Sequence, residues 1–263
     1  MPAHDKVRLD ILLVERGLAK SRERARALIL AGRVLVSEQK IDKPGTSVAA
    51  DAEIRLLGED LPYVSRGGLK LAAALGHWQI AVAGRACLDV GASTGGFTDC
   101  LLQHGAARVT AIDTGFGQIA LKLRNDSRVH LMERTNARLL DPGSLAAAEG
   151  SPELTLLGMD VAFISSTLVL PAVIAAAPSL QEVVILVKPQ FEAGREHVGK
   201  GGIVRDEAAH ELAIRKVADC MTSLNWTVVG TIPSPITGAE GNKEFLLYAK
   251  QLTPPRIRYT ETE

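Results

Sequence analysis

The chain has 263 residues, of which 46 % are hydrophobic, and its 30 basic and 30 acidic side chains give a formal net charge of zero. This composition can fill a hydrophobic core, so it excludes a disordered tail and a collagen-like chain. The neutral total excludes a uniformly basic nucleic-acid binder, and any surface for nucleic acid must therefore be local. The three cysteines lie in no CxxC motif and in no cluster with histidine, which argues against disulfides and zinc and favours a cytoplasmic protein.

Residues 1–60 are predicted to form a small α+β domain of their own. Apolar residues at helical spacing predict short helices around residues 9–13 and 25–29, and Ser21 is placed to cap the second helix. Short strand-like pieces follow at residues 34–36 and 54–57.

Charge is segregated within this domain. Up to Arg33 the chain carries eight basic and four acidic residues, whereas residues 34–60 carry three basic and six acidic residues. One explanation is that the basic residues simply form a solvated helix surface, which is the usual place of such charges. The alternative with a functional consequence is a basic face that contacts nucleic-acid phosphates. The residues expected to bind nucleic acid are Arg8, Lys20, Ser21, Arg22, Arg24, Arg26 and Arg33, together with Arg66 beyond the domain.

A larger α/β domain is predicted over residues 69–253, after a linker at residues 61–68 that contains Pro62 and two glycines. Strand-like runs occur at residues 86–90, 108–113, 129–132, 154–161, 183–187, 227–231 and 245–249, with helical stretches between most of them, the longest at residues 205–224. This alternation predicts a doubly wound, mainly parallel sheet. The last two strands leave no room for a helix and are expected to form an antiparallel hairpin, and residues 254–263 are expected to be a tail.

One apolar run has the length of a membrane span. Residues 161–180 contain no formally charged side chain, but Ser165, Pro171 and Pro178 interrupt the run. A buried strand that continues through a polar turn into a core helix explains this mixture better. The polar segment 1–10 is not typical of a signal peptide, so we expect no contact with a membrane.

The sharpest local signal is the segment 88–98, LDVGASTGGFT, which follows the first strand of the larger domain and opens a helix. Glycine there lets the backbone approach a ligand, and Asp113, at the end of the second strand, is where a carboxylate would meet a pair of ribose hydroxyls. A nicotinamide dehydrogenase would need glycine in place of Ser93. A serine hydrolase, whose GxSxG motif residues 91–95 match, would place this turn after several earlier strands. The pattern favours a methyltransferase, and a glycine turn without a ligand is the remaining alternative.

Motifs along nearly the whole chain resemble the TlyA family of haemolysin-A-like ribosomal RNA methyltransferases, whose catalytic domain is of the FtsJ type. Segments 8–13 and 21–25 resemble the RNA-binding module first described in small-subunit ribosomal protein four. The other matching segments are SRGGLKL at 65–71, the Gly91 loop, MDVAFIS at 159–165, VKPQFEAG at 187–194 and GNKEF at 241–245. The resemblance implies a Rossmann-like domain that uses S-adenosylmethionine, without a metal, to methylate a ribose 2′-hydroxyl of ribosomal RNA.

FtsJ-type enzymes use a Lys-Asp-Lys-Glu tetrad, which by resemblance falls on Lys70, Asp160, Lys188 and Glu244. Because a ribose hydroxyl is a poor nucleophile near neutral pH, it must lose its proton as the methyl group arrives, and Lys188 is the candidate to receive or position that proton. We expect the four groups to titrate as one coupled unit. Taken singly, a surface ion pair is the plainer explanation of each.

The same resemblance implies the contacts of the cofactor. Asp113 is expected to bind the ribose hydroxyls, and Asn136, with Asp141 as the weaker alternative, is expected near the adenine. Phe163 and Phe191 are candidates to stack on a base, although core packing is the common fate of phenylalanine. The residues expected to bind the cofactor are Gly91, Ser93, Thr94, Gly95, Gly96, Phe97, Asp113, Asn136 and Asp160.

Two other functions stay open at this stage. The family name suggests a membrane-active haemolysin, and a chain that had lost catalysis would be an RNA-binding or ribosome-assembly factor. The interrupted apolar run argues against the first alternative, and the intact tetrad argues against the second. We expect a monomer whose partners are ribosomal RNA or ribosomal subunits.

Overall fold

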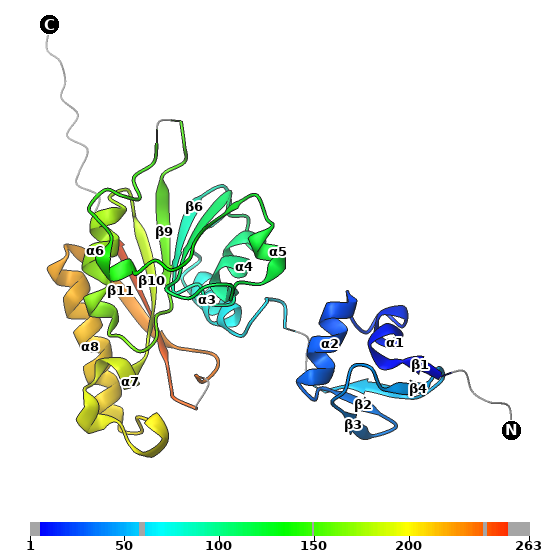
Figure 1. Ribbon diagram of the computed structural model, residues 1–263. Coiled ribbons are helices and arrows are strands. Elements are labelled where there is room, and N and C mark those ends of the chain that lie inside the picture. The colour runs from blue at the N-terminus through cyan, green and yellow to red at the C-terminus, as the bar shows by residue number, and fades with distance from the viewer. Residues whose placement is uncertain (1–5, 58–60, 149, 239–240, 252–263) are drawn as a thin grey trace, which may run out of the picture. The chain divides into compact units, whose positions relative to one another are not determined.

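Two units, each with its own hydrophobic core, make up the chain. The computed structural model describes residues 6–57, 61–148, 150–238 and 241–251, and the units comprise Met1–Asp60 and Leu61–Glu263 (Figure 1). The predicted tail at residues 254–263 lies outside the described residues.

The N-terminal unit is α+β, as predicted. Its elements are β1 (Lys6–Arg8), α1 (Leu9–Glu15), α2 (Arg22–Leu30), β2 (Val34–Val36), β3 (Gln39–Ile41), β4 (Ser47–Ala49) and β5 (Ile54–Leu56). Strands β3, β2 and β5 form one sheet, and β1 pairs with β4. Leu9, Leu13 and Ile29 are fully buried between the helices and strands, and each such side chain stabilises the fold by about 1.5–3 kcal/mol.

Strands β1, β3 and β4 were not predicted, because three-residue strands with polar residues show no alternation to detect. The turn from β2 to β3 also carries no glycine signal. It places Ser37 and Glu38 at φ angles of 49° and 62°, a conformation that hairpin turns usually assign to glycine or asparagine.

A buried carboxylate joins the two helices of this unit. Asp10, in the first turn of α1, is 0 % exposed and accepts hydrogen bonds from Nε of Arg8 at 3.0 Å and from Nε of Arg22 at 2.9 Å. These hydrogen bonds, from Arg8 above all, lower the pKa of the Asp10 carboxyl to about 2. Arg8 and Arg22, both expected to bind nucleic acid, are therefore oriented by an ion-pair network within the unit.

Asp10→Asn is expected to destabilise the N-terminal unit near neutral pH by roughly 1–2 kcal/mol, a figure reduced because both guanidinium groups are half exposed. A lowered carboxyl pKa stabilises the fold fully above the unfolded-state pKa, near 4, and this contribution disappears as the pH falls toward 2. Thermal melts of both proteins at pH 7 and pH 3 measure the effect. The same difference in melting temperature at both pH values would contradict an ionic origin.

The C-terminal unit alternates strands and helices. Its elements are α3 (Gly67–His77), β6 (Ala86–Val90), α4 (Gly96–Gln103), β7 (Arg108–Ile112), α5 (Leu121–Arg124), β8 (Val129–Met132), β9 (Leu154–Met159), α6 (Leu170–Ala176), β10 (Glu182–Val187), α7 (Pro189–Glu192), α8 (Glu207–Ser223), β11 (Trp226–Pro233) and β12 (Phe245–Gln251). Helix α3 begins at Gly67, inside the segment 61–68 that was predicted to be a linker.

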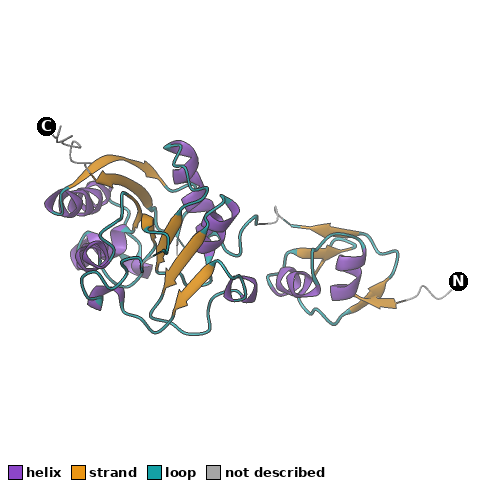
Figure 2. Cartoon of the chain, turned by 90° about the horizontal axis from the view of Figure 1, so that it is seen from above, coloured by secondary structure: helices purple, strands orange, loops and turns teal. Residues whose placement is uncertain are grey.

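The seven strands of this unit form one sheet in the order β11-β12-β10-β9-β6-β7-β8. Strands β6 to β10 run parallel to their neighbours of that group, and β12 is antiparallel to both β10 and β11. The predicted doubly wound sheet with an antiparallel C-terminal hairpin is thus confirmed. Figure 2 shows the strands seen from above, with helices on both sides of the sheet.

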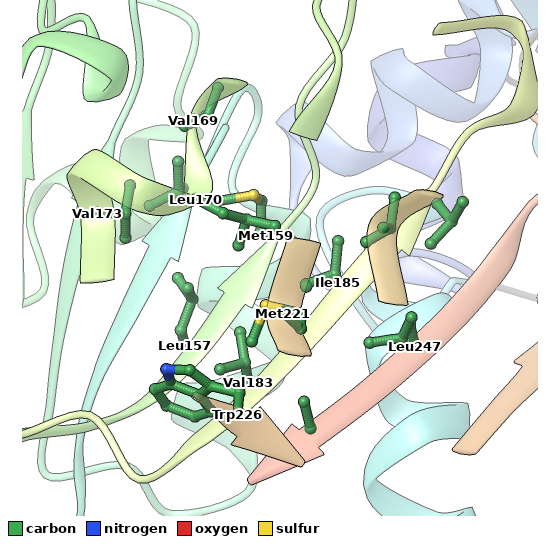
Figure 3. Packing of buried hydrophobic residues seen from close by; sticks show 14 of the residues in the cluster. Leu157, Met159, Val169, Leu170, Val173, Val183, Ile185, Met221, Trp226 and Leu247 are labelled. Atoms are coloured by element: carbon green, nitrogen blue, oxygen red, sulfur yellow. The ribbon is translucent and has the colours of Figure 1, made fainter. Parts of the chain in front are cut away.

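Both faces of the sheet are covered, which explains the nearly continuous apolar sequence of β10. Val183, Ile185 and Val187 belong to the cluster that includes residues of α6 and α8, whereas Val184 and Leu186 belong to the cluster with α3 and α4. Figure 3 shows the first of these clusters, where side chains from β9 and β10 meet Met221 and Trp226.

The apolar run at residues 161–180 contains no strand, because β9 already ends at Met159, two residues before the predicted end. The run begins as a loop and continues into α6. None of the helices formed by the described residues is long and apolar enough to cross a membrane.

Candidate active site

The strand order reverses between β6 and β9, and in open α/β sheets ligands bind at this point, beyond the carboxyl ends of the strands. A cavity of about 510 Å³ lies there, lined among others by Gly91, Asp113, Asn136 and Asp160. A second cavity of about 360 Å³ shares Gly91, Ser93 and Asp160 with the first, so the two cavities adjoin.

The Gly91 loop needs its glycine for a close backbone approach. Gly91 has a φ angle of 87°, and a Cβ atom there would lie 2.3 Å from the carbonyl oxygen of Asp160. The loops that follow β6 and β9 therefore touch through backbone atoms, and the N–H of Asp160 donates to the carbonyl of Val90 at 2.9 Å. A side chain at position 91 would push these loops apart.

Asp113 ties the Gly91 loop to the turn after β7. Its Oδ2 accepts the N–H of Ser93 at 2.7 Å, and its Oδ1 accepts the N–H of Gly115 at 2.6 Å. A carboxylate has about four acceptor positions, so these two bonds leave capacity for a ligand in the cavity that Asp113 lines.

Asp89, the acidic residue of the Gly91 loop segment, is fully buried at the end of β6. Its Oδ2 accepts the hydroxyl of Thr98 at 2.6 Å, whereas its Oδ1 has no hydrogen-bond partner among the residues that the structure describes. Burial raises the pKa of Asp89 to about 7, and the nearby Asp160 and Asp113 add to the shift. Three carboxyl groups thus surround the Gly91 loop.

The four residues of the predicted tetrad come together in the smaller cavity. Lys188 follows β10 and Asp160 follows β9, and Lys188 Nζ lies 2.6 Å from Asp160 Oδ1. Lys70, on α3, is hydrogen-bonded to Glu244, which directly precedes β12. Buried charges persist only when they are paired, and the Lys70 and Glu244 side chains are only 10 % and 3 % exposed. The cavity therefore presents two lysine–carboxylate pairs side by side.

The remaining predicted residues are distributed unevenly. Thr94 and Gly96 line the smaller cavity, and Asn136 lines the larger one while its Oδ1 also accepts the N–H of Arg138 at 3.1 Å. The Phe97 ring lines the smaller cavity but is only 3 % exposed and packs in the core. Gly95 lies outside the lining of both cavities, and its φ angle of 96° and the 2.2 Å from a Cβ there to Leu123 both favour glycine at this position.

The residues expected to bind nucleic acid divide between the two units. Arg66 belongs to the C-terminal unit and lines the tetrad cavity, and the other seven belong to the N-terminal unit. Ser21 caps α2, where its Oγ accepts the N–H of Arg24 at 3.2 Å. Asp141 is exposed and lies outside the lining of both cavities.

Sequence reasoning missed the buried carboxylate Glu192, which accepts hydrogen bonds from Ser165 and Ser166. The segments 159–165 and 187–194 were noted as motifs, but burial and mutual contact cannot be read from a motif. Within the described ranges, no group of three or more His, Cys, Asp or Glu residues is arranged to hold a metal ion.

A doubly wound sheet with a terminal antiparallel hairpin, a glycine loop after the first strand and a carboxylate after the second defines a Rossmann-like methyltransferase. The model of the FtsJ-like methyltransferase family matches residues 63–251, and that of the S4 domain matches residues 7–54. The chain belongs to the FtsJ-like methyltransferase family and carries an S4 domain before the catalytic domain.

Relatives of known name cover almost the whole chain. The chain is 44 % identical to the 16S/23S rRNA (cytidine-2′-O)-methyltransferase TlyA of Mycobacterium tuberculosis, over 94 % of this chain and 91 % of that protein. It is 47 % identical to YqxC of Bacillus subtilis, named as a candidate rRNA methyltransferase, over 92 % of this chain and 85 % of the relative. A solved structure from Streptococcus thermophilus, described as a candidate hemolysin, has a TM-score of 0.70 and 43 % identity, and covers 96 % of this chain and 91 % of that one.

Proposed function

We propose that the protein transfers the methyl group of S-adenosylmethionine to a ribose 2′-hydroxyl of ribosomal RNA. The observation that carries this proposal is the pairing of Lys188 with Asp160 and of Lys70 with Glu244 in one cavity, next to the Gly91 loop. The activity named for the relative from Mycobacterium tuberculosis supports the choice of a ribose hydroxyl in rRNA.

The residues of the larger cavity fit S-adenosylmethionine. When bound, this cofactor supplies a methyl group already activated on a positively charged sulfur. Asp113 and Asp160 place carboxylates at the cavity wall, which suits a ligand with two positive charges and a ribose diol. The close approach of Gly91 to Asp160 brings the loops after β6 and β9 together at the cavity wall, and Asn136 lines the wall where the adenine is proposed to lie.

The tetrad acts on the ribose hydroxyl. Lys188 Nζ lies 2.6 Å from Asp160 Oδ1 as an ion pair, and Asp160 Oδ1 accepts no hydrogen bond from the described residues, so the N–H groups of Lys188 stay available to a hydroxyl in the cavity. As a neutral amine Lys188 receives the hydroxyl proton on its lone pair, whereas as an ammonium it positions the hydroxyl oxygen by donating to it; in either form Asp160 orients Lys188. Lys70 and Glu244 line the same cavity and fix the ribose, so that its oxygen is aligned for in-line transfer.

The S4 domain supplies affinity for structured RNA, mainly through phosphate contacts of basic residues such as Lys20 and Arg26, both exposed on or next to α2. Arg66, at the entrance of α3, contacts the same RNA beside the tetrad.

The proposal is tested with tritiated S-adenosylmethionine and ribosomal subunits that lack the modification. We expect wild-type protein to label the RNA, with the label recovered in a 2′-O-methyl nucleoside after digestion. Glu244→Gln, which removes the charge that holds Lys70, is expected to reduce the labelling at least about 10²-fold. Label on a base would refute the ribose as acceptor, and cofactor binding without label on either subunit would refute ribosomal RNA as substrate.

A further inference from the structure

A buried carboxylate outside the tetrad connects the two loops that carry Asp160 and Lys188. Glu192 is the last residue of α7, four positions after Lys188, and is 4 % exposed. Its Oε1 accepts the N–H of Ser166 at 2.6 Å and the hydroxyl of Ser166 at 2.8 Å, and its Oε2 accepts the hydroxyl of Ser165. Both serines belong to the loop that leaves β9 through Asp160.

These hydrogen bonds, more than an ion pair, balance the burial of Glu192. The nearest cation is Lys216 of α8, whose Nζ lies 3.9 Å from Oε2 and donates instead to the Glu192 main-chain carbonyl at 3.0 Å. A carboxylate leaves water only when hydrogen bonds replace those of the solvent, and here three bonds come from the loop after β9. The buried position of the Glu192 carboxylate therefore depends on hydrogen bonds from this loop.

The loop that Glu192 holds forms a wall of the larger cavity. Residues 160–164 line that cavity, and Phe163 within them is 93 % exposed with a φ angle of 64°. A left-handed backbone at a bulky residue persists only where its surroundings fix it. The Phe163 ring lies 5.5 Å from the ring of Phe191, the residue before Glu192, so a second contact joins this loop to α7.

We propose that Glu192 is a positioning residue for methyl transfer, which holds the Asp160 loop against α7 so that Asp160 and Lys188 meet at the acceptor hydroxyl. This inference rests on the proposed function. Glu192 lines neither the larger nor the smaller cavity, so it can act on the reaction only through Ser165 and Ser166. A displacement of about 1 Å at a reacting centre lowers rates by about 10²-fold, so loosening this loop should reduce kcat.

The test compares Glu192→Ala with Glu192→Gln and with a matched control, Glu182→Ala. Glu182 is a partly buried carboxylate at the other end of β10, bonded to Arg85 and Tyr248. We expect Glu192→Ala to lower kcat for RNA methylation about 10- to 100-fold, with a smaller change in the KM for subunits. Glu192→Gln should recover most of the rate, because its amide oxygen still accepts the N–H of Ser166. Glu182→Ala should lower the melting temperature without changing kcat per folded molecule.

Wild-type rates in Glu192→Ala would overturn the positioning role. A fall in kcat no larger than that of Glu182→Ala, after correction for unfolded protein, would also overturn it. So would a change confined to KM, or a Glu192→Gln variant whose kcat does not recover. Each of these outcomes leaves methylation by the wild-type protein intact, whereas a wild-type protein that fails to methylate either subunit would refute the proposed function itself.

Discussion

Lys188→Ala is expected to reduce the rate of RNA methylation by about 10²- to 10⁴-fold, the range for loss of a group that handles a proton in the transition state. Lys188 Nζ lies 2.6 Å from Asp160, and the side chain is 13 % exposed in the tetrad cavity. Removing it takes away the group proposed to receive or position the hydroxyl proton, and it also leaves Asp160 without its cation. Both consequences act at the acceptor hydroxyl, so the loss should appear in kcat.

Two controls separate this chemistry from folding and cofactor binding. Binding of S-adenosylhomocysteine, measured by calorimetry, should persist in Lys188→Ala, because Lys188 lines only the smaller of the two cavities. Lys188→Arg keeps the positive charge beside Asp160, but a guanidinium stays protonated and so cannot receive the hydroxyl proton. Its methylation rate should therefore remain low, while its melting temperature stays near that of wild type. Methylation by Lys188→Ala at the wild-type rate would rule out a role for Lys188 in proton handling.

Removal of residues 1–60 is expected to abolish RNA methylation and to leave cofactor binding intact. The S4 domain and the methyltransferase domain have separate cores, and both cavities are lined by residues of the C-terminal unit alone. The truncated chain also keeps the contact of the Val64 N–H with Asp99 Oδ2 at 2.8 Å, which anchors the segment before α3. Phosphate contacts of basic residues supply much of a protein's affinity for nucleic acid, so labelling at limiting subunit concentration is expected to fall to background.

A full-length variant checks that the truncation acts through charge. Lys20→Glu combined with Arg26→Glu reverses two exposed cations of the S4 domain without touching its core. This variant should weaken subunit binding and flatten its dependence on salt concentration, while the kcat at saturating subunits remains near wild type. Undiminished methylation by the truncated chain would refute this division of labour between the two domains.

Much of the C-terminal fold follows from patterns that a sequence displays directly. Strands β6 and β8 have the predicted bounds, because each run is mainly apolar and is followed by a residue that interrupts it, Gly91 after β6 and Glu133 after β8. Other strand ends differ by one or two residues, for example at β11, which extends the predicted 227–231 to Trp226–Pro233. In the N-terminal unit β1, β3 and β4 escaped prediction, since each has only three residues with polar or small side chains among them and so carries little local signal.

The candidate site divides in the same way. The resemblance to FtsJ-type enzymes predicted Lys70, Asp160, Lys188 and Glu244, and the parallel pairing of β9 with β10 explains why Asp160 and Lys188, which follow these strands, lie together. Lys70 is different, because it reaches the site only through the packing of α3 on α4 and the edge of β12, contacts between segments far apart in the chain.

By itself, the sequence determined the class of fold and the glycine loop, because these depend on local periodicity and backbone freedom, and its resemblance to FtsJ-type enzymes predicted the residues of the tetrad. Only the tertiary structure decided which lysine pairs with which carboxylate, that Asp10 holds Arg8 and Arg22, and that Glu192 binds the loop after Asp160. Pairing and burial arise from contacts across the chain, and their energies depend on distance and on exclusion of water, which no local pattern encodes.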